Sequence, residues 1–285
     1  MNLRFEPESW PHIERGLPEA LYHGYDAMSA SRLKVLDRAT SLHLAHEIAN
    51  PADSPAFAVG RALHSLVLTP HLWGRDFAEA PKVDRRTKEG KAIYDNFLMT
   101  TGSKTVLTSD QGDEVAAMSA AVMANPDAAQ VCRELEGQAE LSLFAEVAGI
   151  KAKARFDRYV EVGGEGIIVD LKTTSGSASK DEFERSVWNF GYGLQCCFYL
   201  HMARLCGLDP KHFVFVVVEK AAPHAVAVYR FKDEVVASFE PTMMRLVEKY
   251  RSYLSDGPKG YEGVTEIGIP SWALARIQAE ENCNV

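Results

Sequence analysis

The hydrophobic pattern of the chain changes part-way along its length. Over roughly the first 130 residues, apolar positions recur three and four apart, which is the spacing of amphipathic helices. Residues 1–28 show no clear period, and residues 79–92 are polar and rich in Lys and Arg, so an exposed loop is expected there. Three helices are predicted: one capped by Ser29 or Ser31 and running through Leu33, Val35 and Leu36, one from Ser54-Pro55 to near Pro70, and one over residues 109–124 that ends at Asn125-Pro126.

Strand patterns begin near residue 140. Glu140–Glu146 and Ile150–Val160 both alternate, and Val147-Ala148-Gly149 between them predicts a hairpin. Further strands are expected over Gly166–Lys172, His212–Val218 and His224–Phe231, and helices over Ser179–Leu205 and residues 233–254. This order predicts one α/β domain, with an N-terminal helical part over 1–130, a core over 131–260 and a C-terminal tail over 261–285.

Composition and charge limit the function classes. The chain is 46% hydrophobic and 25% charged, which is ordinary for a globular protein. No apolar run is long enough for a membrane helix, and the N-terminus has no signal-peptide pattern, so a cytoplasmic protein is expected. The five cysteines have no metal-type or disulfide-type spacing, which argues against zinc and iron–sulfur sites. A net charge of −8 is unfavourable for a nucleic-acid ligand unless the cations are concentrated locally.

One predicted strand carries cations that lead to a carboxylate. Side chains alternate across a strand, so Lys151, Lys153, Arg155 and Asp157 are expected to share one face of Ile150–Val160. Such a strip suits a phosphate-bearing polymer that must reach a metal ion. We expect each of the three cations to contribute to DNA binding and to its salt dependence.

The next strand ends in a second carboxylate and a lysine. Asp170 and Lys172 are two residues apart and share a face, which we expect to be open to solvent, whereas Leu171 points into the core with its carbonyl free to turn outward. Two carboxylates and a carbonyl suit Mg²⁺, for which Mn²⁺ often substitutes, and Lys172 is placed to orient or deprotonate an attacking water. A lone Asp-x-Lys is usually a surface ion pair. Here it ends an apolar strand, follows Asp157 on the preceding strand and precedes two threonines, and this combination favours a catalytic centre.

These residues resemble the PD-(D/E)xK nuclease superfamily, with Phe156 in place of the proline before Asp157. The run from Asp170 to Thr174, Asp-Leu-Lys-Thr-Thr, is typical of its RecB-like and RecE-like branch. Gly60-Arg-Ala-Leu-His64 resembles the G-x-x-x-H motif of that branch, which implies that His64 is a metal ligand with Asp157, Asp170 and the Leu171 carbonyl. Gln195 and Tyr199 match its Q-x-x-x-Y motif, and Glu140 lies where these enzymes carry an upstream acidic residue. The resemblance implies a PD-(D/E)xK core, in which a central mixed sheet is flanked by helices.

Both ends of the chain extend the likeness to the RecE-like (exodeoxyribonuclease VIII) group of phages and prophages. The start from Tyr22-His23 to Ser29-Ala-Ser31-Arg-Leu-Lys34 resembles the opening of that group, and Ile269–Ala273 resembles its close. The resemblance implies Mg²⁺-dependent, 5′-to-3′ digestion of one strand of linear duplex DNA in a bacterial or phage-infected host. It also implies a strand-annealing partner protein and a ring-shaped homo-oligomer around DNA.

Other residues are candidates for DNA contact or positioning. They are Gln195, Tyr199, Thr173, Thr174, Arg32, Arg61, Arg85 and Arg86. A charged run such as that around Arg85 is more often a solvated loop, and Arg32 is a candidate for a 5′-phosphate only by analogy. Two alternatives stay open: a structure-selective or restriction-type endonuclease on the same core, and a catalytically inert DNA-binding module.

Overall fold

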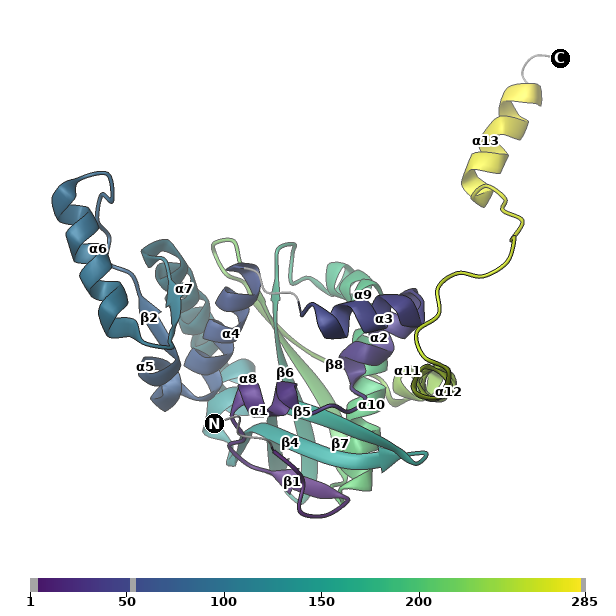
Figure 1. Ribbon diagram of the computed structural model, residues 1–285, viewed down its shortest axis with the longest axis horizontal. Coiled ribbons are helices and arrows are strands. Elements are labelled where there is room, and N and C mark those ends of the chain that lie inside the picture. Colours follow the sequence, from purple (N-terminus) through teal and green to yellow (C-terminus); the bar gives the residue numbers. More distant parts are fainter. Residues whose placement is uncertain (1–4, 52–54, 283–285) are drawn as a thin grey trace.

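A six-stranded mixed sheet forms the centre of the molecule (Figure 1). The structure, a computed structural model, describes residues 5–51 and 55–282. The strand order is β1-β4-β5-β6-β7-β8, in which only β6 and β7 are parallel. The strands are β1 (His12–Glu14), β4 (Gly137–Val147), β5 (Ile150–Val162), β6 (Glu165–Thr174), β7 (Pro210–Glu219) and β8 (Val226–Arg230). The predicted fold class, a central mixed sheet flanked by helices, is confirmed.

The expected hairpin joins β4 to β5. Val147 pairs with Ile150, and Ala148 and Gly149 between them both have positive φ, as a two-residue hairpin turn requires. The parallel step from β6 to β7 needs a crossover. That crossover is made by α9 (Lys180–Asn189) and α10 (Tyr192–Leu205). The predicted single helix over 179–205 is therefore two helices, which separate at Gly191, whose φ of 61° is left-handed.

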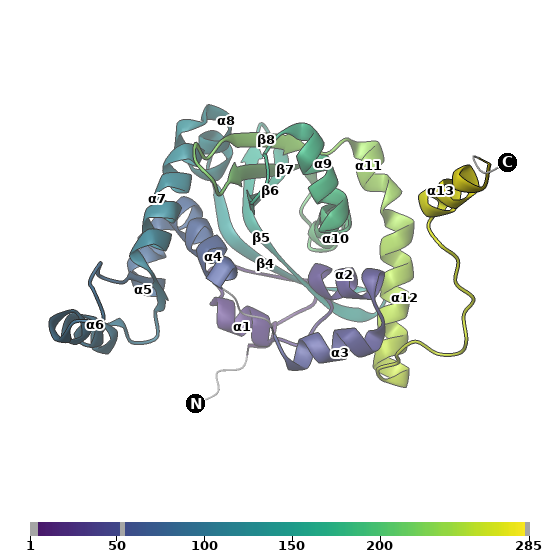
Figure 2. The same cartoon turned by 90° about the horizontal axis from the view of Figure 1, so that it is seen from above.

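Helices cover both faces of the sheet (Figure 2). One face packs against α2 (Ala30–Arg38), α10 and α12 (Glu240–Asp256) through a core that includes Leu33, Phe198 and Leu246. The other packs against α4 (Pro55–Leu68) and α7 (Ser109–Ala124) through Leu63 and Met118. Because both faces are buried, the central strands carry apolar residues on both sides.

The expected helices in the first half form, with added detail. Ser29 caps α2 by accepting a hydrogen bond from the Arg32 backbone N–H at 3.4 Å, whereas Ser54, the other predicted helix start, lies outside the described residues. Thr108 and Gln111 form a capping box at the start of α7. The remaining helices here are α3 (Ser41–Ala49), η1 (Pro70–Leu72), α5 (Trp73–Asp76), α8 (Pro126–Ala129) and the π-helical turn η2 (Gln130–Glu134).

Two segments expected to be irregular contain regular structure. Within residues 1–28, β1 adds an edge strand against β4, and α1 (Glu19–Gly24) packs through Tyr22 against Phe144 of β4. The charged segment 79–92 leads into α6 (Lys88–Thr101), because Thr87 accepts a hydrogen bond from the Gly90 backbone N–H and so caps a helix start. Two short strands, β2 (Phe77–Glu79) and β3 (Thr105–Leu107), flank α6 in the sequence and pair with each other. We call the segment between them, residues 80–104, the α6 projection.

The C-terminal helical region is also divided. The predicted helix over 233–254 is α11 (Asp233–Ser238) followed by α12, with a break at Phe239. After α12 the chain is extended and then forms α13 (Ser271–Asn282), which stands apart from the body (Figure 1). Among the described residues, no helix combines the length and apolar character needed to cross a bilayer.

Candidate active site

The two predicted carboxylates lie where neighbouring strands separate. The antiparallel pairing of β5 with β6 ends at Arg158 opposite Val169, the immediate neighbours of Asp157 and Asp170. Beyond this point the two backbones are no longer paired. The Leu171 backbone N–H donates instead to the side chain of Asp157, at 2.8 Å from Oδ2. The opening of the sheet thus holds both carboxylates at one point and ties the first to the strand that carries the second.

Asp170 is almost completely buried. Asp170 is 1% exposed, so the expectation that it faces solvent is wrong: Gln195 of α10 lies against its side chain. Gln195 Nε2 donates to Asp170 Oδ1 at 2.7 Å. Lys172 Nζ lies 2.6 Å from Oδ2, which is close enough for an ion pair. The angles of this contact are not those of a hydrogen bond, so Oδ2 has no hydrogen-bond partner.

Burial and charge perturb both members of this pair. Burial raises the pKa of Asp170, and the Lys172 ammonium opposes that rise. Burial alone would lower the pKa of Lys172, but the attraction of Asp170 and Asp157 outweighs it and raises that pKa. Strongly perturbed groups beside a cavity are typical of functional sites.

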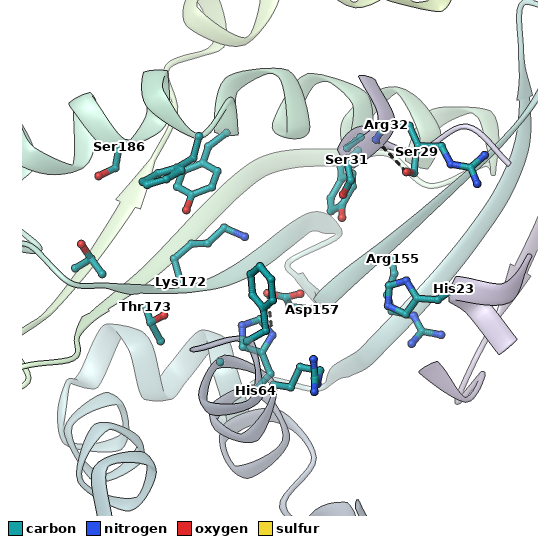
Figure 3. Close-up of a pocket in the computed structure, with 18 of the residues that line it drawn as sticks. His23, Ser29, Ser31, Arg32, His64, Arg155, Asp157, Lys172, Thr173 and Ser186 are labelled. Atoms are coloured by element: carbon teal, nitrogen blue, oxygen red, sulfur yellow. Dashed lines mark hydrogen bonds and ion pairs between the residues drawn. The ribbon is translucent and has the colours of Figure 1, made fainter. Parts of the chain in front are cut away.

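His64 reaches the same point from the opposite layer. It projects from α4, and its Nε2 lies 2.8 Å from the Leu171 carbonyl oxygen while its Nδ1 lies 3.5 Å from Asp157 Oδ2 (Figure 3). The side chain of Leu171 is buried as expected, and its carbonyl turns toward the site. The four groups named as metal ligands by resemblance are therefore neighbours in space.

Glu140 lies directly across the hairpin from Asp157. Ala139 pairs with Arg158 and Leu141 with Phe156, so Glu140 and Asp157 are opposite in register. Glu140 has a φ of 52°, a strained value for a residue with a side chain. Burial and the nearby Asp157 raise the pKa of Glu140 to about 7.

The chemistry of this donor set fits a divalent metal ion. A buried carboxylate oxygen without a hydrogen bond, a second carboxylate, a backbone carbonyl and an imidazole are ligands for Mg²⁺ or Mn²⁺. Within the described residues, no three His, Cys, Asp or Glu side chains are already in coordinating positions. His64 and the Leu171 carbonyl contact each other instead, so small side-chain movements would accompany binding.

A large open cavity of about 1470 Å³ reaches this site. Figure 3 shows Asp157, His64 and Lys172 facing into it from β5, α4 and β6, with Arg32 and Arg155 on the far side. The predicted site residues that line the cavity are Arg32, Arg61, His64, Lys153, Arg155, Asp157, Lys172, Thr173, Thr174 and Tyr199. The cavity is thus lined by cations from α2, α4, β5 and β6.

Three of the predicted DNA-contacting cations lie elsewhere. The Lys151 ammonium lies 5.5 Å from the ring centroid of Trp10, and the Arg85 guanidinium lies 4.1 Å from that of Tyr94 on the α6 projection. Arg86 is exposed beside Arg85. The structure does not bring these three side chains to the cavity.

Lys153 has partners within the protein. It is 5% exposed, and its ammonium donates to the backbone carbonyls of Tyr22 at 2.7 Å and Tyr25 at 2.5 Å. Those carbonyls lie at the end of α1, where a cation is favourable. Lys153 therefore ties α1 to the sheet. Lys153 and Arg155 both border the cavity, but the Lys153 ammonium is bound to carbonyls at the end of α1, so of the expected strip Arg155 is the cation that we expect to meet DNA. The Arg155 guanidinium is itself oriented by Ser142 Oγ and the Leu17 carbonyl.

We expect Lys153→Met to affect stability and not DNA binding. Loss of charge-assisted hydrogen bonds should lower the free energy of unfolding by about 1.5–3 kcal/mol. Urea denaturation measures this change, and the slope of log DNA affinity against log salt should equal that of the wild type. A slope reduced by about one unit would instead mean that the Lys153 ammonium reaches a phosphate.

Two residues of α10 support the site from behind. Gln195 binds Asp170, and Tyr199 lies over Phe156 with 5.2 Å between ring centroids. Sequence reasoning assigned no role to Lys34, which binds Gln195, or to Tyr192, whose ring contacts both Lys34 and Lys172. One signal was present: Lys34 follows buried Leu33 and lies one turn after buried Ala30, an unusual place for a solvated lysine.

Residues 29–256 match the family described as a PDDEXK-like domain of unknown function (DUF3799). The chain belongs to this family. The match includes Asp157, Asp170, Lys172 and His64, which the fold brings together. No curated protein matches the chain.

Solved structures support the fold. The chain is similar to a "Putative exonuclease" from Eubacterium rectale, with 15% identity and a TM-score of 0.60 over 92% of this chain and 98% of that one. It also resembles a phage-related exonuclease from Haemophilus somnus 129PT, with 13% identity and a TM-score of 0.36 over 81% and 96% of the two chains. The first likeness shows a shared architecture over nearly the whole length of both chains, and the second is too weak to support an argument.

Proposed function

We propose that this protein is a Mg²⁺-dependent exonuclease that digests linear double-stranded DNA. The observation that carries the proposal is the convergence of Asp157, Asp170 and Lys172 at the sheet opening, beside a cavity lined by cations. The direction is 5′-to-3′ by resemblance to the RecE-like group, which leaves 3′ overhangs for a strand-annealing partner. Membership of a PDDEXK-like family, and the name of the Eubacterium rectale structure that shares this architecture, support nuclease chemistry.

Each residue has a distinct task in this proposal. Asp157, Asp170, the Leu171 carbonyl and His64 would hold Mg²⁺, which supplies polarisation of the scissile phosphate and of a water molecule. The Lys172 ammonium, held beside Asp170, orients the attacking water and opposes the charge that develops on the phosphate. Arg155 and Arg32 carry fixed positive charge on the far side of the cavity, where the DNA backbone would lie.

The decisive experiment compares DNA substrates with and without ends. Linear duplex labelled at each 5′ end should lose label in Mg²⁺ and not in EDTA, whereas a covalently closed circular duplex should stay intact. Cleavage of the closed circle would establish an endonuclease instead. No Mg²⁺- or Mn²⁺-dependent cleavage of either substrate would support an inert DNA-binding module and overturn the proposal.

The charge of the chain leads to a prediction about assembly. A chain with a net charge of −8 must concentrate its cations to hold a polyanion, and a cyclic homo-oligomer with a basic lining does so. We expect light scattering to give a closed oligomer whose DNA affinity falls steeply with salt. A monomer at working protein concentrations would rule out the ring.

A further inference from the structure

Lys34 is linked to the candidate active site by two hydrogen bonds in series. Its ammonium, on α2, donates to Gln195 Oε1 on α10 at 2.7 Å. Gln195 Nε2 then donates to Asp170 Oδ1 on β6, also at 2.7 Å. The relay crosses three elements, and its second and third members are 7% and 1% exposed.

The relay fixes the orientation of the Gln195 amide. An ammonium can only donate hydrogen bonds, and an ionised carboxylate can only accept them. The amide must therefore turn its oxygen to Lys34 and its nitrogen to Asp170, because the reverse orientation would place donor against donor and acceptor against acceptor. Without Lys34, the Gln195 oxygen would be a buried acceptor without this partner, and the amide would be less firmly held.

The surroundings of Lys34 are shaped to hold it there. A side chain on Gly191 would come within 3.3 Å of Lys34 Cγ, so the glycine at the start of α10 leaves room for the lysine stem. The Tyr192 ring lies 5.1 Å from the Lys34 ammonium and 5.0 Å from that of Lys172. The Tyr192 ring thus attracts both ammonium groups by cation–π interaction.

We propose that Lys34 is a positioning residue that sets the orientation of the Asp170 carboxylate. By holding Gln195, it keeps Oδ1 occupied and turns Oδ2 toward Lys172, on the side of the carboxylate that would bind a metal ion. The inference rests on the proposed function, because it assigns Asp170 a metal-binding task.

Direct DNA binding does not account for Lys34. Its ammonium faces Gln195, and Lys34 is not among the residues that line the cavity, unlike Arg32 on the same helix. Burial and the nearby Lys172 lower the pKa of Lys34 to about 7, a cost that a solvated phosphate contact would not carry. Lys34 instead holds Gln195, which in turn holds the proposed metal ligand Asp170.

The test measures metal binding without DNA. Lys34→Met keeps the aliphatic stem and removes the donor. We expect Mn²⁺ affinity, measured by calorimetry, to fall about 10-fold, as for outer-layer partners in other metal sites. In the cleavage assay kcat should fall while KM for DNA stays near the wild-type value. In a Gln195→Met background, Lys34→Met should have little further effect on Mn²⁺ affinity, because the link it acts through is already absent.

Controls separate this inference from folding and from the proposed function. Lys249→Met removes an exposed lysine that donates to the Leu36 carbonyl on the same α2, and should leave Mn²⁺ affinity unchanged. Lys34→Arg keeps a donor and should bind Mn²⁺ more tightly than Lys34→Met. Unchanged Mn²⁺ affinity in folded Lys34→Met, equal losses in the Met and Arg variants, or a rise in KM alone would each overturn the positioning role. A wild type that binds no metal would overturn the proposed function itself.

Discussion

Asp170→Asn should abolish cleavage of linear duplex DNA in either Mg²⁺ or Mn²⁺. The substitution keeps the volume of the side chain and an oxygen for Gln195, but it removes the charge on the group that faces Lys172. A hard divalent cation binds a neutral amide oxygen much more weakly than a carboxylate. We expect turnover to fall by at least about 10³-fold, as for other groups that act together in a catalytic unit. End-labelled substrate under single-turnover conditions measures this loss.

The same position tests how burial affects stability. Asp170→Ala leaves the Lys172 ammonium and the Gln195 amide without their partner, so the free energy of unfolding should fall by about 3–5 kcal/mol. Asp170→Asn should lower it less, because the amide retains a hydrogen bond from Gln195. Both variants should be inactive, and this separates the catalytic effect from the folding effect. An Asp170→Asn enzyme that cleaves at the wild-type rate would remove Asp170 from the metal centre.

The sheet was predictable because its signals are local. Alternation in β4 and β5, with a short turn between them, predicts the hairpin from neighbouring residues alone, whereas its register follows from the two-residue turn that the structure shows. The helix breaks at Gly191 and Phe239 were missed because the apolar period continues on both sides of each break. Edge strand β1 was missed because its three residues gain their structure only by pairing with β4, far along the chain.

The site residues on β5 and β6 could be predicted from the sequence, whereas the helices that contact them could not. The spacing of Asp157, Asp170 and Lys172 places them together once β5 and β6 pair as neighbouring antiparallel strands. Period-two reasoning also placed Lys153 and Arg155 on the face of Asp157. It could not foresee that α1 would lie against this face and take up the Lys153 ammonium. Contacts between α2 and α10, which bring Lys34 to Gln195, likewise depend on tertiary packing that no local pattern encodes.

Lys172→Ala should lower kcat far more than it changes the affinity for DNA. The Lys172 ammonium lies 2.6 Å from Asp170 Oδ2 and faces the cavity beside Asp157. We therefore expect it to act on the phosphate that is being cleaved and to contribute little to binding the rest of the DNA. A positioned proton donor or acceptor contributes about 10²–10⁴-fold to turnover. We expect a loss of that size in kcat, with KM near the wild-type value. Lys220→Ala, which removes another cation lining the same cavity, should instead raise KM and leave kcat nearly unchanged.

Lys172→Arg distinguishes a compact positioned ammonium from a general positive charge. The Lys172 side chain is 20% exposed and is confined on two sides, by Asp170 and by the Tyr192 ring 5.0 Å from the ammonium. A planar guanidinium is larger and spreads its charge over a fork, so it cannot keep the same distance to Asp170 and to a water on the metal. We therefore expect kcat for Lys172→Arg to stay close to that of Lys172→Ala, although DNA affinity measured in Ca²⁺ equals that of the wild type. Recovery of wild-type turnover by arginine would mean that Lys172 acts only through its charge, and the positioned role would be withdrawn.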